Sequence, residues 1–184
     1  MRNHRQQPTI NAGSVADIAF LLLIFFLVTT TIPNDKGITR KLPRKCELPP
    51  CSVDTYERNI IRISLNKRGE LMVNNDLAQI ADLKDMLIEF IDNNGDQSCT
   101  YCQGNGFEDA SDNPQKAIIS LSSDREASYK DFIAIQAELS AAYYELRERF
   151  IKNTFQKELA SLTREELKQV QQAYPLLISE ADIR

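Results

Sequence analysis

The sequence predicts one apolar helix near the N-terminus, followed by a small α/β (α+β) domain with a mixed sheet and two or more helices. Two observations support this fold class. Residues 15–32 form an apolar run, and no second run of that kind occurs among the 184 residues. From about Ile60 onward, segments in which apolar and polar residues alternate, as is typical of strands, are followed by segments of helical periodicity. Strands and helices that alternate along a chain favour a sheet covered by helices.

The apolar run has the length of a membrane-spanning helix. Its 18 residues reach roughly 27 Å at about 1.5 Å per residue, close to the hydrocarbon thickness of a bilayer. A cleavable signal peptide is the alternative, because Arg2 and Arg5 precede the run. No small-x-small cleavage site follows Val28, however, and an acidic residue lies inside the run. We therefore expect an uncleaved, single-pass anchor.

That acidic residue, Asp17, is the strongest functional signal in the chain. A carboxylate inside a bilayer costs about 2.5 to 3.5 kcal/mol on insertion scales, so it normally faces a partner helix or a water-filled path. We therefore interpret Asp17 as a proton-handling residue. The simpler alternative is that Asp17, near the start of the run, caps the helix at the level of the lipid headgroups.

Spacings of three and four residues place the neighbours of Asp17 on roughly one helical face. These neighbours are Gly13, Ser14, Leu21 and Ile24. The small residues among them let another helix or water approach the carboxyl group.

Residues 33–57 are predicted to form an extended linker. Several prolines and five basic residues occur in this segment, and the prolines prevent a continuous helix. Its basic side chains are suited to contact anionic membrane lipids, at about 1 kcal/mol per residue near a charged leaflet. A solvated spacer is the simpler alternative.

The first elements expected in the domain are a β-hairpin and a helix. Apolar and polar residues alternate over residues 61–65, a turn follows at 66–69, and residues 70–74 resume an extended run. Apolar residues then recur at three- and four-residue steps over residues 80–91, which predicts an amphipathic helix.

A loop, a strand and a long helix are expected next. Residues 93–114 are rich in Asn, Gly and Asp, so we expect an exposed loop, inserted into the domain, that carries two cysteines. Strand signals return at residues 117–121. Ser128 followed by Asp131 then resembles a helix N-cap with an acid three residues later.

Residues 145–175 form a charged tail that is predicted to be helical. Acidic and basic residues are interleaved there, and Thr163 with Glu166 forms a capping-box pattern. Residues 176–179 are apolar enough to form a last strand.

The four cysteines form two close pairs, Cys46 with Cys51 and Cys99 with Cys102. We favour structural disulfides, although four cysteines allow three connectivities. A zinc site would need an irregular ligand spacing, so no metal is expected. A thioredoxin-like site would need its Cys-x-x-Cys at a strand-to-helix junction, whereas this pair lies in a polar loop.

Composition and motifs argue against several classes of function. Residues 66–142 contain 14 acidic and 6 basic residues, so nucleic-acid binding is not expected. The sequence has no glycine loop for phosphate, no serine elbow and no metal-binding histidine pair. We therefore expect neither enzymatic activity nor a cofactor.

Ile10-Asn11, Asp17 and the apolar segment 18–28 form a recognisable N-terminal pattern. The pattern resembles the ExbD/TolR family of biopolymer-transport proteins. The resemblance continues weakly through Lys41-Leu42-Pro43 and through residues 60–121, and covers about two thirds of the chain.

Three features depart from the family pattern. Ser14 stands where the family usually has a proline, which leaves the start of the helix open. The loop around residues 99–102 and the charged tail after Tyr143 also lie outside the pattern.

The resemblance implies a domain order and a location in the cell inner membrane. Residues 1–14 would be a cytoplasmic tail, 15–32 the transmembrane helix, 33–57 the linker and 58–184 a periplasmic domain. The count of basic residues disagrees, because more Lys and Arg follow the span than precede it. Long domains cross membranes regardless of nearby charge, and an even number of cysteines suits an oxidising compartment.

The resemblance also implies partners and a role. Two copies would place their helices inside a ring of ExbB-like or TolQ-like subunits, and the complex would use the proton motive force to drive a TonB-like protein for outer-membrane transport. Lys41, Leu42 and Pro43 are candidate partner-binding residues on the same basis.

Alternative functions stay open at this level. They are a TolR-like subunit of a Tol-Pal envelope system, a MotB-like stator subunit, and a membrane-anchored adaptor that uses no proton gradient. A MotB-like protein would carry a larger peptidoglycan-binding domain than the sequence offers.

Overall fold

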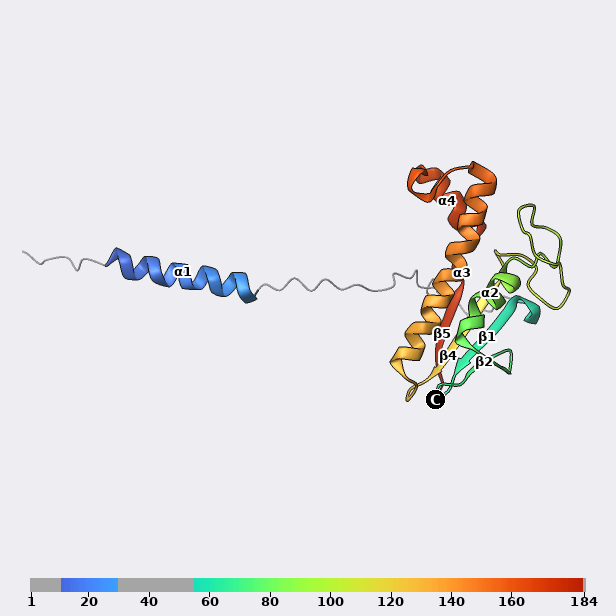
Figure 1. Ribbon diagram of the computed structural model, residues 1–184, viewed down its shortest axis with the longest axis horizontal. Helices are drawn as coiled ribbons and strands as arrows, with labels where there is room; N and C mark the ends of the chain where they lie inside the picture. Colours follow the sequence, from blue (N-terminus) through green and yellow to red (C-terminus); the bar gives the residue numbers. More distant parts are fainter. Residues whose placement is uncertain (1–10, 30–54, 184) are drawn as a thin grey trace, which may run out of the picture. The chain divides into compact units, whose positions relative to one another are not determined.

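The computed structural model describes residues 11–29 and 55–183, which belong to two separate units (Figure 1). The first unit, Met1–Cys51, contributes one helix, and the second unit, Ser52–Arg184, contains a sheet and several helices. One apolar helix followed by a small mixed α/β domain confirms the predicted fold class.

Helix α1 is Ala12–Thr29, so it begins three residues before the apolar run. Asn11 explains this start, because the Gly13 backbone N–H donates to Asn11 Oδ1 at 3.0 Å, as at a helix N-cap. At the other end, the Thr29 hydroxyl donates to the Phe25 carbonyl oxygen at 2.7 Å. Residues 30–32, which the expected span includes, lie outside the described residues.

Five strands form one mixed sheet in the order β3-β2-β1-β4-β5. Strand β1 pairs antiparallel with β2, and β2 pairs antiparallel with β3, whereas β4 lies parallel to both β1 and β5. Parallel neighbours need a long crossover connection, usually with a helix. The strands are β1 (Ile60–Leu65), β2 (Leu71–Val73), β3 (Asp76–Ala78), β4 (Ile118–Asp124) and β5 (Ile178–Ile183).

The helices of the domain lie in these crossovers. Between β1 and β4 the chain forms α2 (Leu83–Ile91), and between β4 and β5 it forms α3 (Tyr129–Phe155) and α4 (Arg164–Ala173). Three short 3-10 turns complete the described elements, namely η1 (Glu57–Asn59), η2 (Ile80–Asp82) and η3 (Leu159–Ser161).

The hydrophobic core lies between one face of the sheet and helices α2 and α3. Alternate residues of β1 are buried while Arg62 between them is exposed, as expected for a strand with one covered face. Each fully buried Leu or Ile contributes about 1.5 to 3 kcal/mol. The core side chains include Ile61, Ile63, Leu65, Ile119 and Leu121 from the sheet and Leu83, Leu87, Ile91, Ile135, Leu139 and Leu146 from the helices.

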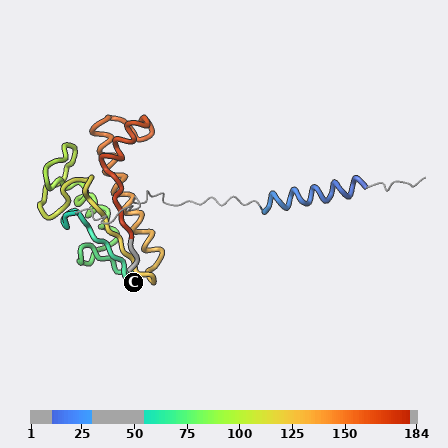
Figure 2. The backbone as a smooth tube through the Cα atoms, turned by 180° about the vertical axis from the view of Figure 1, so that it is seen from behind, coloured from blue at the N-terminus to red at the C-terminus, as the bar shows by residue number. Residues whose placement is uncertain are grey.

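Strand β5 completes the sheet beside α3, as both overall views show (Figures 1 and 2). On α3, Gln136 Nε2 donates to Glu180 Oε1 of β5 at 2.9 Å. The strand begins at Ile178, two residues later than the expected apolar segment. The charged tail after Tyr143 is therefore an integral part of the domain.

Strand β3 was not among the elements expected from the sequence. It follows β2 through a two-residue turn in which Asn74 and Asn75 both have positive φ, 50° and 76°. Two positive φ values at the centre of a tight hairpin are the requirement of a type I′ turn, and Asn tolerates this conformation well. The Asn-Asn pair was the available signal.

The two predicted helix caps have different outcomes. At α4 the capping box is confirmed, because Thr163 Oγ1 accepts from the Glu166 N–H at 3.3 Å while Glu166 Oε2 accepts from the Thr163 N–H at 2.7 Å. At α3, Ser128 does occupy the N-cap position, but its side chain makes no capping hydrogen bond. The predicted capping interaction at Ser128 is therefore wrong, although the predicted boundary is right.

Candidate functional site

Asp17 lies on α1 five residues beyond Ala12, about 7.5 Å along the helix axis. Only the first four N–H groups of a helix lack a partner within the helix, and Asn11 already occupies the N-cap. Asp17 is therefore past the positions at which a side chain caps this helix. This position argues against a capping role for Asp17, while its depth in a bilayer stays a prediction.

The neighbours expected on the same face do lie around Asp17. At about 100° per residue, their directions fall within roughly 60° of the Asp17 direction. They are Gly13 and Ser14 on the preceding turn and Leu21 and Ile24 on the following turns. A carboxyl group on this face has small side chains on one side and branched apolar side chains on the other.

No residue of α1 is buried within the described structure. The large apolar side chains of the helix are between 41% and 73% exposed, with Ile24 the least and Leu27 the most. Apolar surface of this extent needs lipid or partner helices to cover it. Of the described helices, α1 alone is long and apolar enough to cross a membrane. Signal sequences share those properties, so the assignment of α1 as an anchor depends on the family to which the chain belongs.

Several predicted site residues lie outside the described residues. They are Lys41, Leu42 and Pro43 in the linker and the cysteine pair Cys46 and Cys51. The remaining pair, Cys99 and Cys102, is joined in a disulfide.

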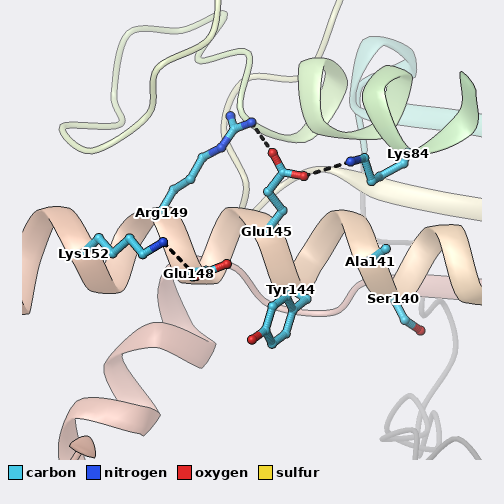
Figure 3. Close-up of a pocket in the computed structure, with 8 residues that line it drawn as sticks. All are labelled: Lys84, Ser140, Ala141, Tyr144, Glu145, Glu148, Arg149 and Lys152. Atoms are coloured by element: carbon cyan, nitrogen blue, oxygen red, sulfur yellow. Dashed lines mark hydrogen bonds and ion pairs between the residues drawn. The ribbon is translucent and has the colours of Figure 1, made fainter. Parts of the chain in front are cut away.

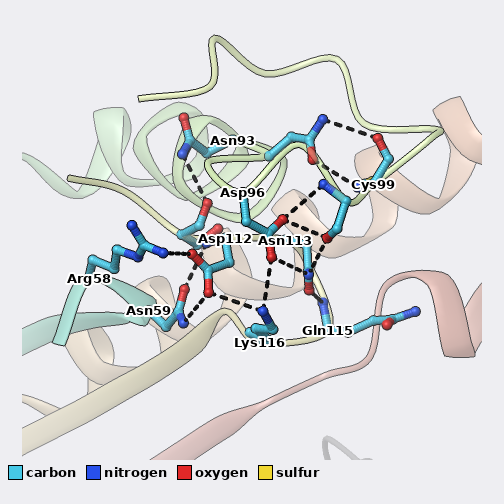
Figure 4. A network of polar contacts seen from close by, with 12 residues as sticks. Arg58, Asn59, Asn93, Asp96, Cys99, Asp112, Asn113, Gln115 and Lys116 are labelled. Carbon is cyan, nitrogen blue, oxygen red and sulfur yellow. Dashed lines mark hydrogen bonds and ion pairs between the residues drawn. The ribbon is translucent and has the colours of Figure 1, made fainter. Parts of the chain in front are cut away.

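The loop that carries this disulfide is anchored at both ends by buried polar groups (Figure 4). Asn93 has no exposed surface, and its Nδ2 donates to the carbonyl oxygens of Phe107 at 2.8 Å and Ser111 at 2.9 Å. The Phe107 N–H donates back to Asn93 Oδ1 at 2.8 Å. The predicted exposed loop is thus exposed or partly exposed along most of its length and buried at its ends, where the polar groups are hydrogen-bonded to one another.

A charged cluster joins the C-terminal end of this loop to the start of the sheet. The Asp112 carboxylate is buried and accepts from Asn59 Nδ2 at 3.0 Å and from Lys116 Nζ at 3.2 Å, and Arg58 is also within ion-pair distance. Burial alone would raise the pKa of Asp112, but these hydrogen bonds and cations outweigh it and lower the pKa. Asp96 accepts hydrogen bonds from the Ser98 hydroxyl and from Lys116 Nζ, the latter at 2.9 Å, and these two contacts lower the pKa of Asp96.

Gly104 explains how the loop returns so close to α2. A Cβ atom at this position would lie 2.3 Å from the Asp92 carbonyl oxygen, so any side chain would clash with backbone. The Gly104 N–H donates to the same oxygen at 3.0 Å. No local sequence signal marks Gly104, Asn93 or Asp112, since an Asn-, Gly- and Asp-rich segment looks alike whether or not it is anchored.

A buried carboxyl group, Asp92, links α2 to the C-terminal part of the domain. Its Oδ1 accepts from the Tyr174 hydroxyl at 2.6 Å, and its Oδ2 accepts from the Gln103 N–H at 3.1 Å. Burial raises the pKa of Asp92, and burial together with the nearby carboxylate raises the pKa of Tyr174. This contact spans 82 residues of sequence, which is why no local pattern indicated it.

An open groove on α3 is lined by charged side chains that neutralise one another (Figure 3). Lys84 Nζ of α2 lies 3.1 Å from Glu145 Oε2, and Arg149 pairs with the same carboxylate. Hydrogen bonds from these two cations lower the pKa of Glu145. The cations of the groove are thus paired with carboxylates of the same groove, and the described residues contain no cluster of three or more metal-ligating side chains.

The comparisons with known proteins cover most of the chain. The family model for biopolymer transport protein ExbD/TolR matches residues 3–147, which include α1 with Asp17, the cysteine loop and most of α3. A comparison with curated proteins finds no match. Members of the matched family are non-enzymatic accessory subunits of transport linked to the proton motive force, and the family together with α1 indicates a single-pass membrane protein. Since the match extends over well more than half of its residues, the chain belongs to the ExbD/TolR family.

Proposed function

We propose that the chain is the proton-handling subunit of an ExbB-ExbD-type complex in the inner membrane. The observation that carries this proposal is the position of Asp17, past the cap of an apolar helix and beside the small residues Gly13 and Ser14. A carboxyl group in such surroundings is stable when it faces a partner or water rather than lipid. We assign it the task of taking up and releasing a proton.

The mechanism follows from the cost of an unsolvated charge. Apolar walls favour the neutral form of a carboxyl group, whereas a hydrated path allows it to ionise. Loss of the charge removes an electrostatic tether to polar groups on surrounding helices. A charge that crosses the membrane potential is worth about 2.3 kcal/mol per 100 mV. Rotation or rocking of the helix is the expected mechanical result.

The proposal includes a topology and a set of partners. Two copies of α1 sit within a ring of ExbB-like subunits, with residues 1–14 in the cytoplasm and the domain in the periplasm, where a disulfide such as Cys99–Cys102 is stable. The domain or the linker, with Lys41, Leu42 and Pro43 as candidate contacts, engages a TonB-like protein. No cofactor takes part.

Replacement of Asp17 by Asn tests the proposal, because the amide keeps the shape of the side chain and cannot ionise. We expect Asp17→Asn to abolish energised outer-membrane transport in cells that depend on this chain, with unchanged protein level and membrane location. Glu126→Gln is the matched control, since it makes the same chemical change on an exposed side chain of the domain and should leave transport intact. Full transport by Asp17→Asn would reject the proton-handling role and favour an adaptor.

The family also contains TolR-like subunits, which serve a Tol-Pal envelope system. Identification of the ring protein that copurifies with the chain separates the two assignments. An ExbB-like ring supports the proposal, whereas a TolQ-like ring would reassign the same proton chemistry to envelope maintenance.

A further inference from the structure

The disulfide-bearing loop reaches across to the C-terminal part of the domain through one side chain, Tyr101. Its ring lies edge-on to Phe150 of α3, with ring centroids 5.0 Å apart, and edge-on to Tyr174 after α4, at 5.5 Å. Its hydroxyl donates to the Ala173 carbonyl oxygen at 2.8 Å. Tyr101 therefore joins the loop to two segments that lie outside or at the margin of the family match.

The rest of the loop keeps its shape by contacts that do not need the disulfide. Asn94 holds the backbone of Cys99 from both sides, since its Oδ1 accepts from the Cys99 N–H at 2.9 Å and its Nδ2 donates to the Cys99 carbonyl oxygen at 3.1 Å. Asn93 holds Phe107 in the same manner, and its Nδ2 also donates to the Ser111 carbonyl oxygen. The conformation that depends on the disulfide is thus confined to residues 99–102, with Tyr101 inside the ring.

Stabilisation of the whole fold is a poor explanation for the presence of this disulfide. A disulfide stabilises mainly by restricting the unfolded chain, and the effect grows with the length of the closed loop. Cys99 and Cys102 are only three residues apart, so the loop they close is among the shortest possible. What this disulfide restrains directly is the backbone of residues 99–102, which carries Tyr101.

The surroundings of the two sulfur atoms favour attack of a thiolate on one of them over the other. The Cys102 N–H donates to Cys99 Sγ at 3.1 Å, and both cysteines are partly exposed. A backbone N–H directed at a sulfur stabilises the thiolate that forms there when the bond breaks. Cys99 is therefore the better leaving group and Cys102 the sulfur to be attacked.

We propose that Cys99–Cys102 is a thiol–disulfide exchange site for a dithiol reductant, and that reduction releases Tyr101 from Phe150 and Tyr174. A thiolate of the dithiol attacks Cys102 Sγ, the sulfur–sulfur bond breaks, and its electron pair passes to Cys99 Sγ. The second thiol of the reductant loses its proton and attacks the reductant's own sulfur in the mixed disulfide, which expels the Cys102 thiolate. The reductant leaves as a disulfide, and two protons complete the cysteine thiols.

Reduction would change one region of the domain. Without Tyr101, the C-terminal end of α3 and the segment around Ala173 lose their contact with the loop, whereas α2 and the central strands keep theirs. This inference is independent of Asp17 and of the proton-handling role.

Hydrogen exchange in the full chain, purified in detergent, tests the proposal. A Cys46→Ser/Cys51→Ser background confines the chemistry to one pair, and dithiothreitol serves as the dithiol probe. Alkylation followed by mass measurement should show two new thiols under native conditions. Amide exchange over residues 147–155 and 170–175 should then be about tenfold faster, since two aromatic contacts and one hydrogen bond are lost. Exchange over residues 83–91 should not change.

Two variants separate release of Tyr101 from a general loosening. Oxidised Tyr101→Ala should reproduce the faster exchange, and reduction should add nothing further in α3 or near Ala173. Phe107→Ala, which removes a half-exposed aromatic side chain of the same loop, should leave exchange in α3 at the level of the parent. The proposal is overturned if the pair resists dithiothreitol until denaturant is added, or if the reduced parent exchanges at the same rate as the oxidised one.

Discussion

Helix α1 and the C-terminal domain are held in shape by different kinds of contact. The described side-chain hydrogen bonds of α1 join residues no more than four apart, such as Thr29 to Phe25, and none of its residues is buried. In the domain, by contrast, Ile63 and Leu121 pair across parallel strands, and Asp92 binds Tyr174 across 82 residues.

The difference shows where each unit obtains its stability. The domain contains its own core, so it depends on its own side chains. Helix α1 presents its apolar side chains outward, so its stability depends on whatever surrounds it. Substitutions on α1 should therefore affect partners and transport, and substitutions in the core should affect unfolding.

The largest expected effect is the loss of a core side chain. Leu139→Ala on α3 removes a fully buried side chain and should reduce the free energy of unfolding of the domain by about 2 to 5 kcal/mol. Urea unfolding of the full chain in detergent, followed by circular dichroism, measures this change. Leu21→Ala on α1 is the matched control and should leave the urea midpoint within error of the parent. An equal loss of stability in both variants would contradict the conclusion that the domain depends on its own core and not on α1.

A smaller effect is expected from a local contact inside the domain. Thr163→Ala removes the capping hydrogen bond of α4 and should cost about 1 kcal/mol in the same urea experiment. Ser128→Ala changes the N-cap of α3, where no side-chain hydrogen bond is made, and should cost clearly less. If Ser128→Ala proved as costly as Thr163→Ala, the hydrogen bond would not be what stabilises these helix starts.

The smallest expected effect is a change in how stability depends on pH. Because the folded-state pKa of Asp92 is raised above 3.8, the stability it contributes is complete below pH 3.8 and is lost as pH rises through the folded value. Asp92→Asn should remove that loss, so the stability of the variant relative to the parent should increase from acid to neutral pH.

The opposite slope is expected for Asp112, whose folded-state pKa is lowered from 3.8. Its contribution is present above pH 3.8 and is lost as pH falls through the folded value. Asp112→Asn should therefore lose stability relative to the parent as pH rises. Urea titrations of the three proteins between pH 3 and pH 7 measure both slopes, and slopes of equal sign would contradict the assignment.

Elements with a clear period were predictable from the sequence. The alternation in β1, the three- and four-residue steps of α2 and the Thr163 capping pattern each led to an element that the structure contains. Their information is local, so a short window of sequence is enough to find them.

Features that depend on a few polar side chains were not predictable in the same way. Asn11 moves the start of α1 to Ala12, because one side-chain oxygen supplies a cap that hydropathy does not register. The Asn74-Asn75 turn creates β3 from only three residues. Asn93 and Asp112 are buried in a segment whose composition is typical of exposed loops, since their partners become neighbours only after the chain has folded.

For the candidate site, the sequence indicated Asp17 and the residues on its face but not the contacts of the cysteine loop. The position of Asp17 follows from the helical repeat, which is a local property. The contact of Tyr101 with Phe150 and Tyr174 joins segments far apart in the chain, and only the folded arrangement reveals it.

The double anchoring of the cysteine loop also offers a place to attach a reporter group. Asn93 and Ser111 hold the ends, while Glu108 and Asp109 between them are exposed. A fluorophore or spin label at Glu108 would follow the orientation of the domain without disturbing its core, provided that Gly104 is kept. Because the chain has no tryptophan, an indole introduced at Glu108 would be its single intrinsic emitter of that type, and would let domain motion be timed in an energised membrane.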